Sequence, residues 1–116
     1  MRMSEIQQFF ARDIVRLLLE MEKQGFKYTF GEAMRSPEQA EIYAKSGKGI
    51  CNSLHCQRLA IDINLFNEKG EFLDKSSDHA PFGKFWESLN PTNRWGGNFK
   101  ERADGNHYER NDRQSI

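Results

Sequence analysis

The stretch AIDINLF, residues 60–66, is the feature that most constrains how this chain can fold. Its side chains alternate with a period of two, which predicts a β-strand whose apolar face is formed by Ile61, Ile63 and Leu65. Asp62 lies within this otherwise apolar run. Carboxylates seldom lie among Ile, Leu and Ala unless a side chain pairs with them or they coordinate a metal. The sequence therefore predicts a specific partner for Asp62.

Three further segments have a helical pattern. Apolar residues recur at three- and four-residue steps over residues 6–21, behind a capping box of Ser4 and Gln7, which predicts a long amphipathic helix. Ser36 and the proline after it indicate a second helix that ends near residue 47. A third, short helix is expected after Asp78 and Pro81, with an apolar face of Phe82, Phe85, Trp86 and Leu89.

Two more strands accompany residues 60–66. Residues 26–35 alternate as a strand does, and the turn at residues 67–70 leads into a short partner strand at residues 71–73. Helices together with short strands favour the α+β class. We expect one small domain in which helices pack on a central antiparallel sheet.

Composition narrows the function classes. The 116 residues are 37% hydrophobic and 29% charged, which is typical of one compact domain, expected here to span residues 1–116. Basic and acidic residues are equal at 17 each, so neither nucleic acid nor an anionic membrane is an expected partner. Residues 1–25 lack the pattern of a signal peptide or a membrane span. We expect a monomer made in the cytoplasm, with Cys51 and Cys56 as reduced thiols.

His55 is a candidate for sharing a metal ion with Asp62. On an unbroken strand the two residues would lie about 23 Å apart, and on a helix they would be separated by about 10 Å along the axis. Bonds to zinc are only about 2 Å long. Binding of one ion by both residues therefore predicts a bend of the chain between Cys56 and Leu59.

A catalytic zinc ion usually has three protein ligands and one water, so a third ligand is expected elsewhere in the chain. His107 is the best candidate, because Asp104 precedes it by three residues in a turn that contains glycine and asparagine. A carboxylate at that spacing can lie beside a ligating imidazole. It could then take a proton from water and return it to a leaving amine.

Each of these residues also has a simpler interpretation. His55 and His107 could be hydrogen-bonded surface histidines, and Asp104 could be an ordinary turn residue. Asp62 could form a structural ion pair with Arg58 or Arg35. A zinc knuckle built on Cys51, His55 and Cys56 fails, because a structural site needs four ligands and the chain has no second cysteine pair.

Taken together, these segments resemble a known family. Ser53-x-His55-x-x-x-x-Ala60-x-Asp62 is similar to the S-x-H-x-x-G-x-A-x-D motif of the M15 zinc peptidases, which include D-Ala-D-Ala peptidases and phage endolysins. Asp104-x-x-His107 resembles the second motif of the family. The stretches RSPEQ, residues 35–39, and WGG, residues 95–97, look like the endolysins that cut L-alanyl-D-glutamate bonds. The resemblance covers about residues 26–109.

The resemblance implies a role for each matching residue. His55, Asp62 and His107 would hold one zinc ion, and Asp104 would be the general base. Arg35 would bind a substrate carboxylate, because a planar guanidinium matches a carboxylate in two hydrogen bonds. Ser53 would lie near the substrate. The implied fold is the α+β fold of the DD-peptidases and of Hedgehog domains.

Two positions depart from the family pattern. Arg58 occupies the place of the family's glycine, so the expected bend lacks glycine's conformational freedom. Asp104 stands where many members have the longer glutamate, which makes its assignment as the base less direct.

The function that the resemblance implies is a zinc endopeptidase of a phage or prophage that cleaves peptidoglycan stem peptides, acting at the cell wall after release. No separate wall-binding domain is expected in 116 residues. Two alternatives remain open at this point. One is a D-Ala-D-Ala carboxypeptidase or dipeptidase, and the other is a catalytically inactive binding domain on the same scaffold.

Overall fold

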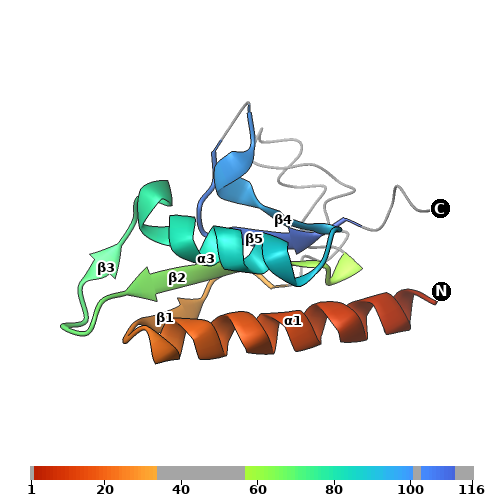
Figure 1. Cartoon of the computed structure of the whole chain (residues 1–116), viewed down its shortest axis with the longest axis horizontal. Coiled ribbons are helices and arrows are strands. Elements are labelled where there is room, and N and C mark those ends of the chain that lie inside the picture. The colour runs from red at the N-terminus through yellow and green to blue at the C-terminus, as the bar shows by residue number, and fades with distance from the viewer. Residues whose placement is uncertain (1, 34–56, 101–102, 112–116) are drawn as a thin grey trace.

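The part of the chain that the structure describes is built on an antiparallel sheet of five strands. In the computed structural model, residues 2–33, 57–100 and 103–111 are described. The strand order is β1-β2-β5-β4, with β3 also paired to β2 (Figure 1). The strands are β1 (Lys27–Phe30), β2 (Ala60–Phe66), β3 (Phe72–Leu73), β4 (Asn93–Trp95) and β5 (His107–Arg110). Every pairing is antiparallel.

Two helices, α1 (Met3–Lys23) and α3 (Ser76–Leu89), contact each other and pack on the sheet (Figure 1). A short 3₁₀ helix, η2 (Gly96–Asn98), follows β4. The fully buried large side chains of the core come from both helices and from the sheet; they are Leu17, Met21, Leu59, Ile63, Leu65, Trp86 and Tyr108. This arrangement confirms the predicted small α+β domain with helices on an antiparallel sheet.

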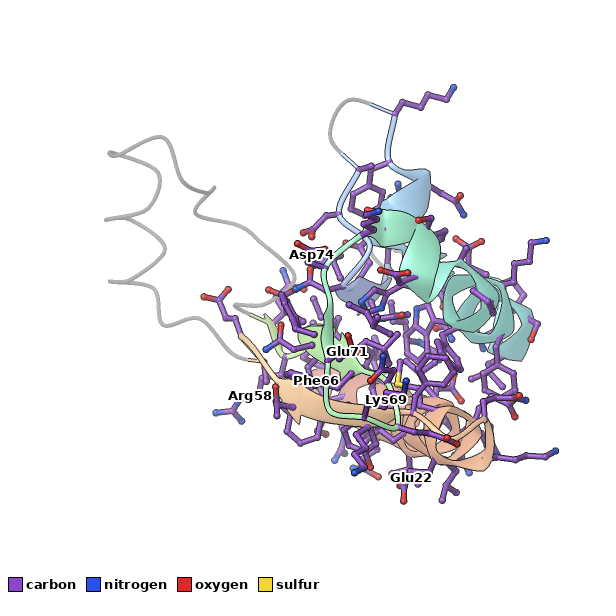
Figure 2. All side chains as sticks on the ribbon, turned by 90° about the vertical axis from the view of Figure 1, so that its left-hand side faces the viewer. Glu22, Arg58, Phe66, Lys69, Glu71 and Asp74 are labelled. Atoms are coloured by element: carbon purple, nitrogen blue, oxygen red, sulfur yellow. The ribbon has the colours of Figure 1, made fainter. Side chains whose placement is uncertain are left out.

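The burial of side chains in β2 alternates as its sequence predicts. Ile61, Ile63 and Leu65 are buried in the core, whereas Asp62 and Asn64 on the opposite face remain partly accessible. The predicted hairpin is also confirmed, because Gly70 N–H donates to the Asn67 carbonyl at 2.9 Å and β3 pairs with the end of β2. Figure 2 labels Phe66, Lys69 and Glu71 along this hairpin.

The predicted long helix exists, but its expected capping box is wrong. The helix begins at Met3 with Arg2 as the N-cap, and no side chain caps its first turn. The Gln7 side chain instead donates a hydrogen bond of 2.9 Å to the Gln57 carbonyl, which lies just before β2. A tertiary contact thus replaces the local one, and it ties the helix to the entrance of the central strand.

Other element boundaries also differ from the sequence prediction. β1 ends at Phe30, although backbone hydrogen bonds between residues 31–32 and Asp62 continue the pairing. α3 begins at Ser76, before Asp78, so Pro81 lies inside the helix. Proline lacks the N–H that would donate to the carbonyl of Ser77, and its ring is exposed. The predicted helix at residues 36–47 lies outside the described residues.

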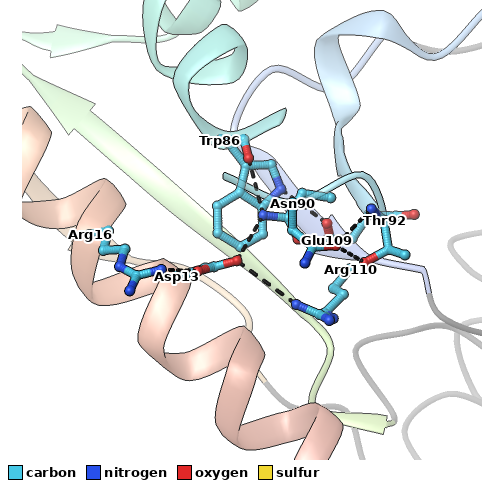
Figure 3. Close-up of polar contacts among 8 residues, drawn as sticks. Asp13, Arg16, Trp86, Asn90, Thr92, Glu109 and Arg110 are labelled. Carbon is cyan, nitrogen blue, oxygen red and sulfur yellow. Dashed lines mark hydrogen bonds and ion pairs between the residues drawn. The ribbon is translucent and has the colours of Figure 1, made fainter. Parts of the chain in front are cut away.

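A buried carboxylate joins α1 to the far edge of the sheet. Asp13 is only 4% exposed and accepts hydrogen bonds from Asn93 at 3.1 Å and from Arg16 at 3.0 Å (Figure 3). Asn93 also donates to the Trp86 carbonyl, and the Trp86 indole donates to the backbone oxygen of Glu109. Burying Asp13 is tolerated because these donors replace its lost hydration.

Within the described ranges, no helix is both long enough and apolar enough to cross a membrane.

The buried histidine of α3 leads to a stability prediction. Burial lowers the pKa of His79 to about 4, and the negative charge of Asp78 opposes this shift only partly. The unfolded chain therefore takes up this proton first as the pH falls, so stability is lost between pH 6.5 and about pH 4. We expect His79→Gln to remove on the order of 3 kcal/mol of this pH-dependent loss.

Urea unfolding of both proteins without metal, at about pH 7 and about pH 4, measures the difference. Equal losses of unfolding free energy in the wild type and the variant would show that His79 is already protonated in the fold.

Candidate active site

The pairing of β2 with β5 brings the two predicted ligands together. Asp62 and His107 are direct partners in the antiparallel register, and Asp62 Oδ1 lies 3.2 Å from His107 Nδ1. Both project from the face of the sheet opposite to the core, because their neighbours Ile61 and Tyr108 are buried in it. His107 is thus a partner of Asp62, and among the described residues no ion pair joins Asp62 to Arg58. Arg35, the other candidate for such an ion pair, lies outside the described residues.

Asp104 completes a group with the composition of a metal site. One ligand atom from each of Asp62, Asp104 and His107 lies within 4.8 Å of the others. Two ligands of one zinc ion, each about 2 Å from it, are separated by up to about 4 Å, so small side-chain movements suffice. Carboxylate oxygens with an imidazole nitrogen are a donor set that zinc accepts in catalytic sites. Asp104 is exposed, so the group is open on one side.

The turn that carries Asp104 is held from several directions. Asp104 N–H donates to the Gly96 carbonyl at 2.9 Å, and Gly105 N–H donates to Ser76 Oγ at 3.0 Å. The Trp95 indole donates to the Gly105 carbonyl at 2.7 Å. A Cβ atom on Gly96 would overlap the Asp104 carbonyl oxygen, so only glycine permits this approach. The WGG stretch noted in the sequence therefore supports the placement of Asp104.

His107 has a second carboxylate partner, which sequence reasoning missed. Glu109 Oε1 lies 2.7 Å from His107 Nε2, and Glu109 is 7% exposed. Two residues apart in β5, both side chains lie on the same face. Residues 107–110 are too few to show a clear alternation, so the sequence predicted only a turn around Asp104 and neither β4 nor β5.

Its two carboxylate partners change the acidity of His107. Burial alone would lower the pKa of this imidazole, but hydrogen bonds to Asp62 and Glu109, with their negative charges, outweigh it and raise the pKa to about 9. In the metal-free protein the ring is therefore held as a cation between two anions. A divalent cation bound at Nδ1 would provide the positive charge that balances the carboxylates in place of the protonated ring.

The chain bends where the sequence requires it. Gln57 and Arg58 form a turn immediately before β2, within the predicted interval between Cys56 and Leu59. Arg58 has a φ angle of 58°, the left-handed conformation that favours glycine. Its side chain is exposed, and Figure 2 shows it at the surface of the molecule. Arg58 thus adopts the backbone conformation that a glycine at this position would supply.

Arg35, Ser53 and His55, together with Cys51 and Cys56, lie outside the described residues. The assignment of His55 as a metal ligand, and of Arg35 and Ser53 as substrate contacts, stays a prediction.

A cavity of about 240 Å³ adjoins the group. Asn64, two residues after Asp62 on the same face of β2, lines it together with Asp104. Asp74 and Ser76, before and at the start of α3, also line it. A molecule bound in this cavity would lie against the exposed side of Asp104.

Comparisons with known proteins agree with this arrangement. A family described as D-alanyl-D-alanine carboxypeptidase matches residues 46–110, which is more than half of the chain. The fold is similar to that of the Serratia marcescens L-Ala D-Glu endopeptidase ChiX, with a TM-score of 0.74 and 20% sequence identity over 93% of this chain and 82% of that chain. No curated protein matches the sequence.

The group of Asp62, Asp104 and His107 leads to a prediction about zinc binding. We expect the wild-type chain to bind one zinc ion, and His107→Ala or Asp62→Ala to weaken zinc binding by more than about 100-fold, because each removes a ligand. Competition with a chromophoric chelator measures the dissociation constants. His79→Gln is the matched control, since it replaces a buried histidine that is not in the group. Equal zinc affinity in all four proteins would contradict the assignment.

The left-handed backbone conformation of Arg58 leads to a prediction about stability. A left-handed conformation costs a non-glycine residue about 1–2 kcal/mol, part of which glycine loses again through its greater freedom in the unfolded chain. We expect Arg58→Gly to raise the free energy of unfolding by about 0.5–1 kcal/mol. Arg58→Ala, which removes the same side chain but keeps Cβ, should produce no such gain. Urea unfolding distinguishes them, and a glycine variant less stable than the alanine variant would contradict the prediction.

Proposed function

Because the chain belongs to the M15 family of peptidases, we propose that it is a zinc-dependent peptidase that hydrolyses the L-alanyl-D-glutamate bond of peptidoglycan stem peptides. The observation that carries this proposal is the group of Asp62, Asp104 and His107, assembled from two strands and a braced turn. Together with Ala60, these are the described residues that match the two family motifs. The fold similarity to an L-Ala D-Glu endopeptidase supports the choice of bond.

In this proposal His55, Asp62 and His107 hold the ion. When bound, zinc supplies the Lewis acidity that polarises the scissile carbonyl and lowers the pKa of water. Asp104 takes the proton from the attacking water and returns it to the leaving amine. Its exposed carboxylate is accessible to both, and the hydrogen bonds of its turn hold it in place without closing the site.

Residues outside the described ranges would complete the substrate site. Arg35 binds a carboxylate of the stem peptide, and Ser53 lies near the substrate. A phage or prophage endolysin is the biological role that we infer from these assignments, with the monomer reaching the cell wall after release from the cytoplasm.

A second candidate function is removal of the terminal D-alanine. The description of the matching family, D-alanyl-D-alanine carboxypeptidase, favours it. The two activities differ in the bond cleaved and not in the catalytic group, so the products distinguish them.

The decisive experiment uses defined muropeptides and mass analysis of the products. We expect scission after L-alanine, whereas loss of one terminal alanine would show carboxypeptidase activity instead. Asp104→Asn should lower turnover by about 10²–10⁴-fold while zinc stays bound, because it removes the base and leaves the ligands. Glu68→Gln is the control, since it makes the same change on an exposed turn of the β2–β3 hairpin.

Chelation should abolish wild-type activity, and added zinc should restore it. A zinc-loaded wild type that cleaves no stem peptide would contradict the proposed function and favour a binding domain. Loss of zinc by Asp104→Asn would instead make Asp104 a ligand and not the base.

A further inference from the structure

Glu109 is a buried carboxylate that the proposed reaction does not use. It lies in β5, two residues after His107 on the same face of the sheet, and it is 7% exposed. Its Oε1 atom lies 2.7 Å from His107 Nε2, which is the nitrogen turned away from Asp62. The carboxylate therefore lies behind the ring as seen from the metal group.

Among the described residues, Glu109 has few other groups that could balance its charge. A buried carboxylate is costly unless it is paired and hydrogen-bonded. Arg94, its cross-strand neighbour, approaches Glu109 Oε2 only to 3.9 Å, and the arginine side chain is 51% exposed. The Arg94 guanidinium lies over the Phe99 ring instead. The close contact of Glu109 is thus the imidazole, which explains why a carboxylate is present at this buried position.

The two ring nitrogens of His107 face different partners. Nδ1 lies 3.2 Å from Asp62 Oδ1, on the side of the metal group, and Nε2 points to Glu109. A neutral imidazole has one N–H donor and one lone pair, and a metal needs the lone pair. A carboxylate at Nε2 accepts the N–H there, which leaves the lone pair on Nδ1.

We propose that Glu109 is a positioning residue that accepts the Nε2–H of His107, so that Nδ1 presents its lone pair to the metal ion. The inference rests on the proposed function for the presence of zinc. Glu109 itself touches neither the ion nor the substrate. It acts by fixing the tautomer of the ring and, together with Asp62, its orientation.

Three variants test this proposal: Glu109→Ala, Glu109→Gln and Tyr108→Phe. We expect Glu109→Ala to weaken zinc binding by about 10–100-fold. Glu109→Gln should have a smaller effect, because its amide oxygen still accepts the Nε2–H without a negative charge. Chelator competition gives the dissociation constants.

Tyr108→Phe is the matched control within the same strand. It removes a buried contact of 2.7 Å between the Tyr108 hydroxyl and His79 Nδ1 on the opposite face of the sheet. This variant should lose stability and keep its zinc affinity within about twofold, since it leaves the ring of His107 unaltered. Thermal unfolding of the metal-free proteins measures the cost to the fold separately.

Nitrogen-15 spectra of the histidine rings provide a second measurement. In the zinc-loaded wild type, His107 should carry its proton on Nε2, and in Glu109→Ala a mixture of ring states should appear. Unchanged zinc affinity and an unchanged tautomer in Glu109→Ala would overturn the proposal, as would an equal loss of affinity in Tyr108→Phe. If Glu109→Ala does not fold, Glu109→Leu, which fills the buried space without a hydrogen-bond acceptor, decides in the same way.

These outcomes are distinguishable from failure of the proposed function. A wild type that binds zinc and cleaves stem peptides, with no effect of Glu109 on affinity, removes the positioning role alone. A wild type that binds no zinc overturns both.

Discussion

The antiparallel pairing of β2 with β5 is the constraint on which the rest of the structure depends. Its register sets Ile61 opposite Tyr108 in the core and Asp62 opposite His107 on the other face. A shift of the β2 register by one residue would turn Asp62 toward the core and Ile61 toward the other face of the sheet. Burial of Ile61 and Tyr108 in the core therefore also fixes the positions of Asp62 and His107, because these residues are their neighbours along the two strands.

The same coupling extends to Asp104. The turn that carries it is fastened to the start of α3 through Ser76 and to β4 through Trp95. The Trp95 ring in turn packs so closely on Gly83 of α3 that no Cβ fits there. An exposed carboxylate on a short turn would otherwise sample many positions. Here it is connected to a helix and a strand of the core, which limits the loss of entropy when a substrate binds.

Buried and partly buried acidic groups have two different uses in this protein. Asp13 accepts hydrogen bonds from Asn93 and Arg16 and joins α1 to β4, far along the chain. Asp62 and Glu109 instead lie on either side of one imidazole. Arginine and amide donors satisfy the structural carboxylate permanently. The carboxylates of Asp62 and Glu109 contact an imidazole, whose protons a metal ion can displace.

The sequence by itself determined the local structure and the chemical types at the site. The alternation of β2, the periodicity of α1 and the hairpin after Phe66 follow from side-chain polarity and turn residues, so they were predictable. The need for a bend near Arg58 followed from the length of a metal–ligand bond. The motif residues also indicated the family before any pairing was known.

Only the tertiary structure decided which partners these residues have. β4 and β5 are three and four residues long, too short for a clear pattern. They are strands because β5 pairs with β2 and β4 pairs with β5. Gln7 contacts the turn before β2 because that carbonyl is near, although its spacing from Ser4 suggested a cap. Glu109 became visible only once β5 placed it behind His107. Such contacts join residues far apart in sequence or depend on strand pairing, and local propensity contains no information about either.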